Sequence, residues 1–295
     1  MLALFEEASQ AFELRSPPVQ TVPFIFNSPH SGRSYPPDFI AASRLDAAAI
    51  RRSEDLFVDE LFAGVTAMGA PILMAHFPRA YLDVNREPYE LDPRMFRDAL
   101  PGFANIASLR VAGGLGTIPR IVADNMEIYR DRLDVSEALE RIDRLYRPYH
   151  ACLRKLMAAT HVRFGHAVLI DCHSMPDNVR VGSSGMRPDF IIGDRYGTSA
   201  SGDLTALACS ILSGMGYHVL RNKPYAGGFI TEHYGRPGKG LHALQIEINR
   251  GLYAEEQAYA KNRHFDSVVA DIEHFVAMMI DVVMQQYEDR ALAAE

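Results

Sequence analysis

Cysteine is scarce in this chain, which has three cysteines among 295 residues. Cys152, Cys172 and Cys209 are scattered, odd in number and without CxxC spacing. A disulfide framework needs paired cysteines, and a cysteine-based zinc site needs closely spaced ones. We therefore expect neither kind of site, and we expect a protein of the reducing cytoplasm.

Long apolar runs are absent as well. No stretch reaches the roughly 18–20 apolar residues that a helix needs to cross a bilayer. The N-terminus carries Glu6 and Glu7, where a secretory signal would have a basic start and an apolar run. We expect neither a membrane segment nor a secretory signal.

Positive charge is in deficit, because 30 Lys and Arg face 37 Asp and Glu, giving a net charge of −7. This balance argues against nucleic acid or an anionic membrane as the main partner. The GxGxxG, P-loop, GxSxG and HExxH patterns are also missing, so nucleotide-binding and serine-hydrolase functions have no support.

What the chain does contain is an alternation of short apolar runs with longer helical patterns. The runs that predict strands are Pro23–Asn27, Pro71–His76, Tyr81–Asn85, Ala167–Cys172, Phe190–Gly193, His218–Arg221 and Leu244–Asn249. The patterns that predict helices are Asp46–Met68, Ser136–Arg163 with an interruption at Pro148, Ser199–Ser213 and Ala254–Arg290.

This alternation predicts a three-layer α/β/α sandwich around a central mixed, mainly parallel sheet. No repeat, low-complexity tract or long linker interrupts the chain, so we expect one domain over residues 1–295. In open α/β sheets, ligands bind at the carboxyl ends of the strands. The candidate catalytic and ligand-binding residues lie near these carboxyl ends.

Two histidines come directly after predicted strands. His30 follows Pro23–Asn27, and His173 follows Ala167–Cys172. Asp171, two residues before His173, points to the same face of its strand and can hold the second ring nitrogen, as acids do behind metal-binding histidines. Either histidine alone can also be a structural residue bonded to backbone; the pair favours a metal.

A catalytic zinc ion usually has three protein ligands, often two histidines and a carboxylate. The pair Glu54 and Asp55 can supply that carboxylate, although acids near a helix start are also favoured by the helix dipole. Glu247 alternates with apolar residues along its predicted strand, so that Gln245, Glu247 and Asn249 share one face, and Glu247 can act as a general base. The alternative for Glu247 is a buried ion pair with Arg250 or another arginine.

Arginines and a glycine-rich segment complete the candidate groups. Arg79, Asn85 and Arg86 surround the predicted strand Tyr81–Asn85, and arginine binds carboxylates well because its planar guanidinium donates two parallel bonds. The segment PYAGGFITEHYGRPGKG precedes the Glu247 strand, and its backbone can approach a ligand closely. Both features also have ordinary structural explanations.

In this order the residues resemble the N-formylglutamate amidohydrolase family, over about Pro23 to Gln257. The matching stretches are NSPHSG, EDLFVDELF, AYLDVNRE, GLGTIPR, IDRLYRPYH, LIDCHSMP, DFIIGD and GGFITEHYGRPGKGLHALQIEINRGLY. The resemblance implies a zinc-peptidase-like α/β fold. It also implies that His30 and His173 bind Zn²⁺ together with Asp55, with Glu54 as the alternative, and that Glu247 is the catalytic base.

By the same resemblance, Arg86 and Asn85 bind the substrate carboxylate, and Thr231 and Tyr234 line the pocket. One position departs from the pattern: members that act in histidine degradation tend to have arginine after the threonine of the glycine-rich segment, where this chain has Glu232. The resemblance therefore implies the reaction class, while the amino acid and the acyl group of the substrate stay open.

The function implied is zinc-dependent hydrolysis of an N-acyl amino acid, with N-formyl-L-glutamate giving L-glutamate and formate. The alternatives are a zinc deacylase or carboxypeptidase for other N-acyl amino acids or short peptides, and a non-catalytic binding protein on the same fold. The sequence does not fix the oligomeric state, and another divalent ion can replace zinc.

Overall fold

A computed structural model describes residues 11–183 and 185–292 of the chain. Glu6 and Glu7 lie outside these ranges, so the expectation of no secretory signal stays a prediction. The chain forms two compact units from interleaved segments. Unit 1 comprises Met1–Glu13, Pro29–Asp55 and Leu73–Lys155, and unit 2 comprises Leu14–Ser28, Leu56–Ile72 and Leu156–Glu295. The expectation of a single domain also stays a prediction.

The predicted mixed, mainly parallel sheet is confirmed. Seven strands pair in the order β1-β3-β2-β4-β7-β5-β6. They are β1 (Phe12–Arg15), β2 (Phe24–Ser28), β3 (Ile72–Ala75), β4 (Ala167–Met175), β5 (Phe190–Gly193), β6 (Val219–Arg221) and β7 (Leu241–Asn249). The β2–β4, β4–β7 and β5–β6 pairs are parallel, whereas β5 runs antiparallel to β7.

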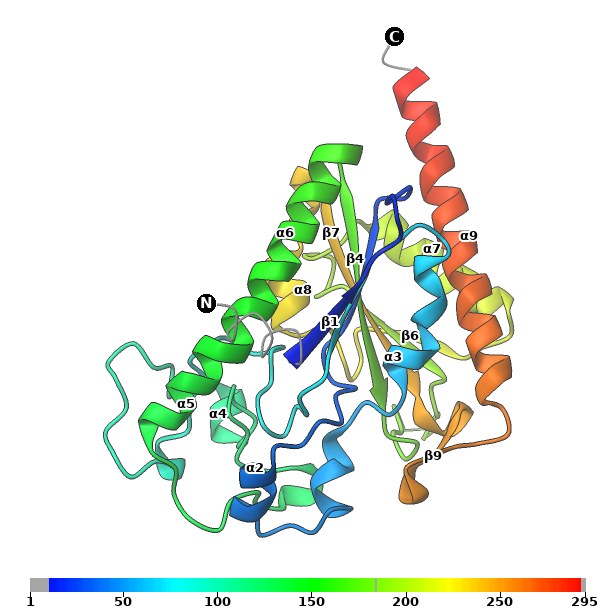
Figure 1. Cartoon of the computed structure of the whole chain (residues 1–295). Helices are drawn as coiled ribbons and strands as arrows, with labels where there is room; N and C mark the ends of the chain where they lie inside the picture. The colour runs from blue at the N-terminus through cyan, green and yellow to red at the C-terminus, as the bar shows by residue number, and fades with distance from the viewer. Residues whose placement is uncertain (1–10, 184, 293–295) are drawn as a thin grey trace. The chain divides into compact units, whose positions relative to one another are not determined.

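The strands at the centre of unit 2 are buried from end to end. Every residue of β2 and β4 is buried, as expected of strands covered on both faces. The helices of this unit are α3 (Val58–Leu61), α7 (Gly202–Gly214), α8 (Phe229–Tyr234) and α9 (Phe265–Leu292). In Figure 1, α3, α7 and α9 lie on one side of β4 and β7, and α8 lies on the other. Within unit 2 the sheet is therefore the middle layer.

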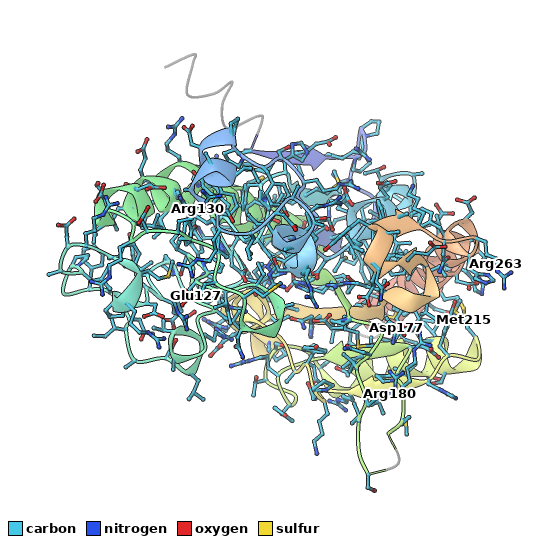
Figure 2. All side chains as sticks on the ribbon, turned by 90° about the horizontal axis from the view of Figure 1, so that it is seen from below. Glu127, Arg130, Asp177, Arg180, Met215 and Arg263 are labelled. Atoms are coloured by element: carbon cyan, nitrogen blue, oxygen red, sulfur yellow. The ribbon has the colours of Figure 1, made fainter. Side chains whose placement is uncertain are left out.

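Smaller elements complete unit 2. Four short helical turns lie before, between or after its strands, and a two-stranded ribbon leads to the last helix. These elements are η2 (Ala63–Thr66), η6 (Pro237–Lys239), η7 (Arg250–Leu252), β8 (Ala254–Glu255), η8 (Glu256–Ala258) and β9 (Ala260–Lys261). The segment that leaves β4 carries Asp177 and Arg180, both labelled in Figure 2.

Unit 1 is built from short helical segments joined by turns. They are α2 (Pro37–Ala42), η1 (Ala49–Ser53), η3 (Pro93–Met95), α4 (Leu109–Ala112), η4 (Ala123–Asn125), α5 (Val135–Arg141), the π-helical η5 (Ile142–Tyr146) and α6 (Arg147–Phe164), whose last residues belong to unit 2. The predicted interruption at Pro148 takes the form of η5. Proline lacks the N–H that an α-helix uses, and the wider π turn directly before it absorbs the mismatch.

Two of the predicted elements are wrong, and a third begins later than predicted. The expected helix Asp46–Met68 is broken into η1, α3 and η2, because Glu54 is extended and Phe57 has a left-handed backbone with φ of 57°. The expected strand Tyr81–Asn85 consists of turns. The last helix begins at Phe265 rather than Ala254, since β8, η8 and β9 occupy the intervening residues.

None of the helices within the described ranges combines the length and the apolar character that crossing a bilayer requires. The three cysteines, Cys152, Cys172 and Cys209, are free thiols.

A buried carboxylate holds the turn that follows β5. Residues 195–197 have positive φ angles of 53°, 56° and 84°, a conformation that residues other than glycine rarely adopt. Asp194 is fully buried directly before this turn. Its carboxylate accepts hydrogen bonds from Gly197 N at 3.0 Å, Asn222 Nδ2 at 2.6 Å, Thr205 Oγ1 at 2.9 Å and the guanidinium of Arg221.

We expect Asp194→Ala to lower the free energy of unfolding by about 3 kcal/mol, because it leaves several donors without their acceptor. Burial alone raises the pKa of Asp194, but the hydrogen bonds, led by that of Arg221, hold it below its ordinary value. The stabilisation is therefore complete above the unfolded pKa of about 3.9 and is lost as the pH falls through the lower folded pKa. Urea unfolding at pH 7 and at pH 3 measures this; a difference between variant and wild type that grows in acid contradicts it.

Candidate metal centre

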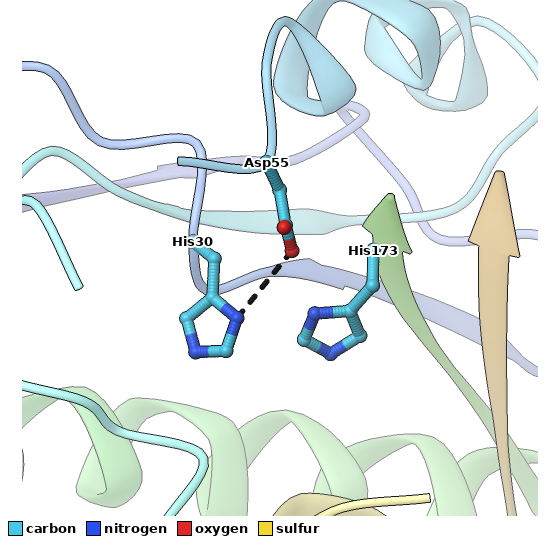
Figure 3. Close-up of side chains that lie close together, drawn as sticks. All are labelled: His30, Asp55 and His173. Carbon is cyan, nitrogen blue, oxygen red and sulfur yellow. Dashed lines mark ion pairs between the residues drawn. The ribbon is translucent and has the colours of Figure 1, made fainter. Parts of the chain in front are cut away.

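Three side chains converge on one point. His30, Asp55 and His173 each offer one ligand atom, and these atoms all lie within 4.8 Å of one another. Figure 3 shows the carboxylate of Asp55 above the two imidazole rings. All three residues are at most 3% exposed. Two imidazoles and one carboxylate form the ligand set that catalytic zinc sites commonly use, with a further position left for water or substrate.

The sheet and the broken helix explain how these residues come to their places. His30 lies two residues after β2, and β2 pairs in parallel with β4, which carries His173. Asp55 lies in the extended break between η1 and α3. A continuous helix over this region would have fixed Asp55 on a helical face. The break instead lets the chain place its carboxylate beside His30, where Asp55 N also donates to the carbonyl of His30 at 3.0 Å.

The surroundings of His30 fit a bound cation. Its Nε2 lies 2.7 Å from Asp83 Oδ1, and its Nδ1 lies 3.4 Å from Asp55 Oδ2. With Nε2–H donating to Asp83, a neutral imidazole presents the lone pair of Nδ1 towards the carboxylate of Asp55. Two acceptors that face each other in a buried place require a proton or a metal ion between them. This arrangement suits a metal ligand.

Asp83 is a buried acid with strong cationic support. Burial alone raises its pKa, but the positive charges of Arg86 and Arg79 and the hydrogen bond from His30 together hold the pKa well below its usual range. Arg79 Nη2 donates to Asp83 Oδ2 at 2.9 Å, and Asn85 N donates to Asp83 Oδ1 at 2.8 Å. Asp83 is therefore an anion that orients the imidazole of His30.

His173 has an equivalent support on its own strand. Its Nε2 lies 2.9 Å from Asp171 Oδ2, as the period-2 geometry of the strand predicts. The other oxygen of Asp171 accepts from Asn27 Nδ2 at 2.7 Å. Asn27 is the register partner of Asp171 across the β2–β4 pair. The ring of His173 is thus held from two strands of the sheet.

The two acids that the sequence left as alternatives have different surroundings. Glu54 is fully engaged elsewhere, since its Oε1 accepts from Tyr35 at 2.7 Å and from Arg51 Nε at 2.9 Å, and its Oε2 accepts from Arg51 at 3.0 Å. Asp55, by contrast, belongs to the converging group. Its position favours Asp55 as the carboxylate ligand.

Glu247 lies beside this group on β7. Its Cα is the register partner of His173 across the parallel β4–β7 pair, so the two side chains share one face of the sheet. Figure 3 shows β7 next to the strand that carries His173. Glu247 is 7% exposed, and its Oε1 accepts from Gln245 Nε2 at 2.8 Å. The suggested partner Arg250 binds Ser174 Oγ at 3.0 Å and Glu256 Oε1 at 3.3 Å.

Comparison with known proteins identifies the family. The family model described as N-formylglutamate amidohydrolase matches residues 22–254. The chain belongs to the N-formylglutamate amidohydrolase family. It is accordingly an amidohydrolase, with a buried His-Asp-His group that can hold a metal.

Relatives from several bacteria resemble this amidohydrolase over most of their length. N-formylglutamate deformylase of Pseudomonas aeruginosa is 29% identical over 240 residues, which cover 80% of this chain and 84% of the relative. The deformylase of Pseudomonas putida is 26% identical over 238 residues, covering 80% and 83%. The crystal structure of N-formylglutamate amidohydrolase from Ralstonia eutropha JMP134 matches with a TM-score of 0.88 and 34% identity, covering 94% of this chain and 99% of that one.

The residues predicted to bind substrate have mixed surroundings. Arg86 Nε donates to Leu115 O at 2.7 Å and its Nη1 to Asn85 O at 2.8 Å, while its Nη2 lies 3.6 Å from Asp83 Oδ2. Arg86 and Asn85 thus sit next to the acid that orients His30. Their role towards a substrate stays a prediction.

The two predicted pocket residues of α8 are both buried. Thr231 Oγ1 donates to Gly228 O at 2.9 Å, and Tyr234 is 6% exposed. Glu232, between them, is exposed, and its carboxylate pairs with Arg195 Nη2 at 2.6 Å. Its charge is therefore balanced within the chain. The pocket-lining role of Thr231 and Tyr234 stays a prediction.

Sequence reasoning missed the role of Asp83. It lies in AYLDVNRE, between Arg79 and Arg86, and that flanking by two arginines was the available signal. The partnership with His30 could not be found in this way, because 53 residues separate the two in the chain.

We expect Asp55→Asn to weaken zinc binding by at least 100-fold, because it removes the anionic ligand, and Glu54→Gln to change it less than 3-fold. The two neighbours are matched in position and in the charge removed. Competition with a chromogenic chelator measures both affinities. A larger loss of zinc affinity in Glu54→Gln than in Asp55→Asn would assign Glu54 as the carboxylate ligand in place of Asp55.

We expect Asp83→Asn to weaken zinc binding about 10- to 100-fold, since an amide holds the imidazole of His30 without the negative charge that raises its basicity. Asp92→Asn is the control. Asp92 is equally buried and is bound by Arg94 and Arg120 rather than by a histidine. Equal zinc affinities in the two variants would show that Asp83 does not support the metal site.

Proposed function

We propose that this amidohydrolase is a zinc enzyme that hydrolyses the amide bond of N-formyl-L-glutamate, releasing formate and L-glutamate. The observation that carries the proposal is the register of β4 against β7, which sets Glu247 beside His173 and hence beside the group of potential metal ligands. The choice of substrate is supported by the family and by the names of the Pseudomonas relatives.

His30, Asp55 and His173 would hold the ion. Bound there, Zn²⁺ would supply a Lewis acid that makes water acidic near neutral pH and polarises the amide carbonyl. Asp83 and Asp171 fix the rings of the two histidines, so that each presents one nitrogen to the ion. Their negative charges would also partly offset the charge of the ion.

Glu247 acts as the general base. Its carboxylate removes a proton from water as the oxygen attacks the formyl carbon. The C–N bond then breaks, and Glu247 returns the proton to the leaving nitrogen, which departs as the amine of glutamate. One carboxylate thus serves both steps, which requires that it stay in one place throughout. The hydrogen bond from Gln245 helps to satisfy this requirement.

The carboxylates of the substrate need cationic partners. Arg86 is the candidate that the family resemblance supplies, and the neighbouring Arg79 is 23% exposed at its side chain. We propose that Arg86 and Asn85 bind the α-carboxylate from this position, and that Thr231 and Tyr234 line the pocket. Glu232 on α8 pairs with Arg195 in the turn after β5, so this ion pair adds no net charge, and a substrate other than glutamate is the second candidate.

We expect chelator-stripped protein to release formate from N-formyl-L-glutamate only after one equivalent of zinc is added. We expect Glu247→Gln to bind zinc as the wild type does but to lose at least 1000-fold in kcat, because the amide cannot accept the proton. Formate release coupled to formate dehydrogenase measures both.

The controls separate the reaction from the substrate. Zinc binding without formate release, together with hydrolysis of another member of an N-acyl amino acid panel, would replace the substrate and keep the reaction. Zinc binding with no hydrolysis of any member would leave a binding protein. Retained turnover in Glu247→Gln would remove the general base from the proposal.

A further inference from the structure

Gln245 occupies the same place relative to Glu247 as Asp171 does relative to His173. Asp171 precedes His173 by two residues on β4, and Gln245 precedes Glu247 by two residues on β7. In the parallel register, Asp171 pairs with Gln245 and His173 with Glu247. Asp171 therefore contacts His173, and Gln245 contacts Glu247, each from two positions earlier on the same strand.

The side-chain amide of Gln245 has a single possible orientation. Its Oε1 accepts from the backbone N of Gly228 at 3.0 Å, and its Nε2 donates to Glu247 Oε1 at 2.8 Å. A backbone N–H only donates, so the amide oxygen must face Gly228 and the NH₂ group must face Glu247. Both bonds are buried. One oxygen of Glu247 is thereby held as an acceptor, and the direction of the other follows from it.

The loop that supplies Gly228 is itself fixed on the sheet. This glycine-rich loop, residues 225–228, crosses β5 at Gly193, the register partner of Gln245 on that strand. A Cβ at Gly193 would lie 2.7 Å from Ala226 C and 2.9 Å from Gly227 N, so the loop backbone rests directly on the strand. Arg195 N adds a hydrogen bond to Ala226 O at 2.7 Å. Gly228 thus offers its N–H from a stable position.

We propose that Gln245 is a positioning residue for catalysis: it fixes the carboxylate of Glu247 by connecting it to the backbone of the glycine-rich loop. The proposal rests on the role of Glu247 as general base. A buried carboxylate on a strand can otherwise adopt several rotamers, and proton transfer requires the accepting oxygen within hydrogen-bond reach of the attacking water. Gln245 removes that freedom without adding a charge next to the base.

Two substitutions separate the two bonds. Gln245→Glu keeps the length of the side chain and an oxygen that accepts from Gly228, but it replaces the NH₂ donor to Glu247 by a second carboxylate oxygen. Gln245→Met keeps the length and loses both bonds. We expect each to lower kcat about 10- to 100-fold, with KM changed less than 3-fold and zinc stoichiometry unchanged, since misplacement of a catalytic group costs rate rather than binding.

Asn222→Asp is the matched control. Asn222 is another buried amide in unit 2 that joins a backbone N–H to a carboxylate, accepting from Asp194 N at 3.0 Å and donating to Asp194 Oδ1 at 2.6 Å. Its change to an acid alters stability in the same way but touches neither Gln245 nor Glu247. We expect this variant to keep the kcat of the wild type at a temperature where it is folded.

Hydrogen exchange gives a readout without substrate. We expect the amide of Gly228, followed in a peptide spanning residues 225–231, to exchange faster in Gln245→Met but not in Gln245→Glu. A wild-type kcat in Gln245→Glu, or an equal loss in Asn222→Asp, overturns the positioning role. A wild-type protein that hydrolyses no N-acyl amino acid with zinc overturns the proposed function, and the role of Gln245 falls with it.

Discussion

The parallel pairing of β4 with β7 is the constraint on which the chemistry of this protein depends. It brings His173 and Glu247 side by side on one face of the sheet. It also pairs Asp171 with Gln245, the residues two positions earlier on the same strands that contact them. A shift of one residue in this register would turn either strand's functional side chains to the opposite face. The hydrophobic residues that alternate with them would then meet the polar face. Burial of the apolar side chains and placement of the polar ones are therefore enforced by the same register.

Buried charge is the second organising factor. Burying an acid is costly unless a partner stabilises the ionised form, and three acids near the site have such partners. Arginines surround Asp83, an asparagine amide binds Asp171, and a glutamine amide binds Glu247. Positively charged side chains thus stabilise Asp83 next to His30, whereas neutral amide groups donate hydrogen bonds to the acids on β4 and β7. A metal ion between the histidines would meet anions from both sides without a competing cation on β4 or β7 among these contacts.

The sequence was sufficient for the central strands, because their apolar runs are local patterns, but it missed β1 and predicted a strand over Tyr81–Asn85 where the chain forms turns. Period-2 alternation placed Asp171 behind His173 and Gln245 on the face of Glu247, and the apolar runs located the central strands. The sequence did not predict where the backbone is irregular. Asp46–Met68 has the periodicity of a helix, yet Phe57 turns left-handed and frees Asp55. The contact of Asp83 with His30 joins two loops and depends on tertiary structure, so no local pattern contains it.

The wide spacing of the candidate ligands along the chain has a consequence for folding. His30 and His173 belong to segments that meet when β2 pairs with β4, and this pairing closes a loop of well over one hundred residues. Closing so long a loop is entropically costly and slow compared with local helix formation. The ligand set is therefore complete only after the central sheet has formed. A metal ion would arrive as a late stabiliser of an existing fold, and would contribute little as a nucleus for folding.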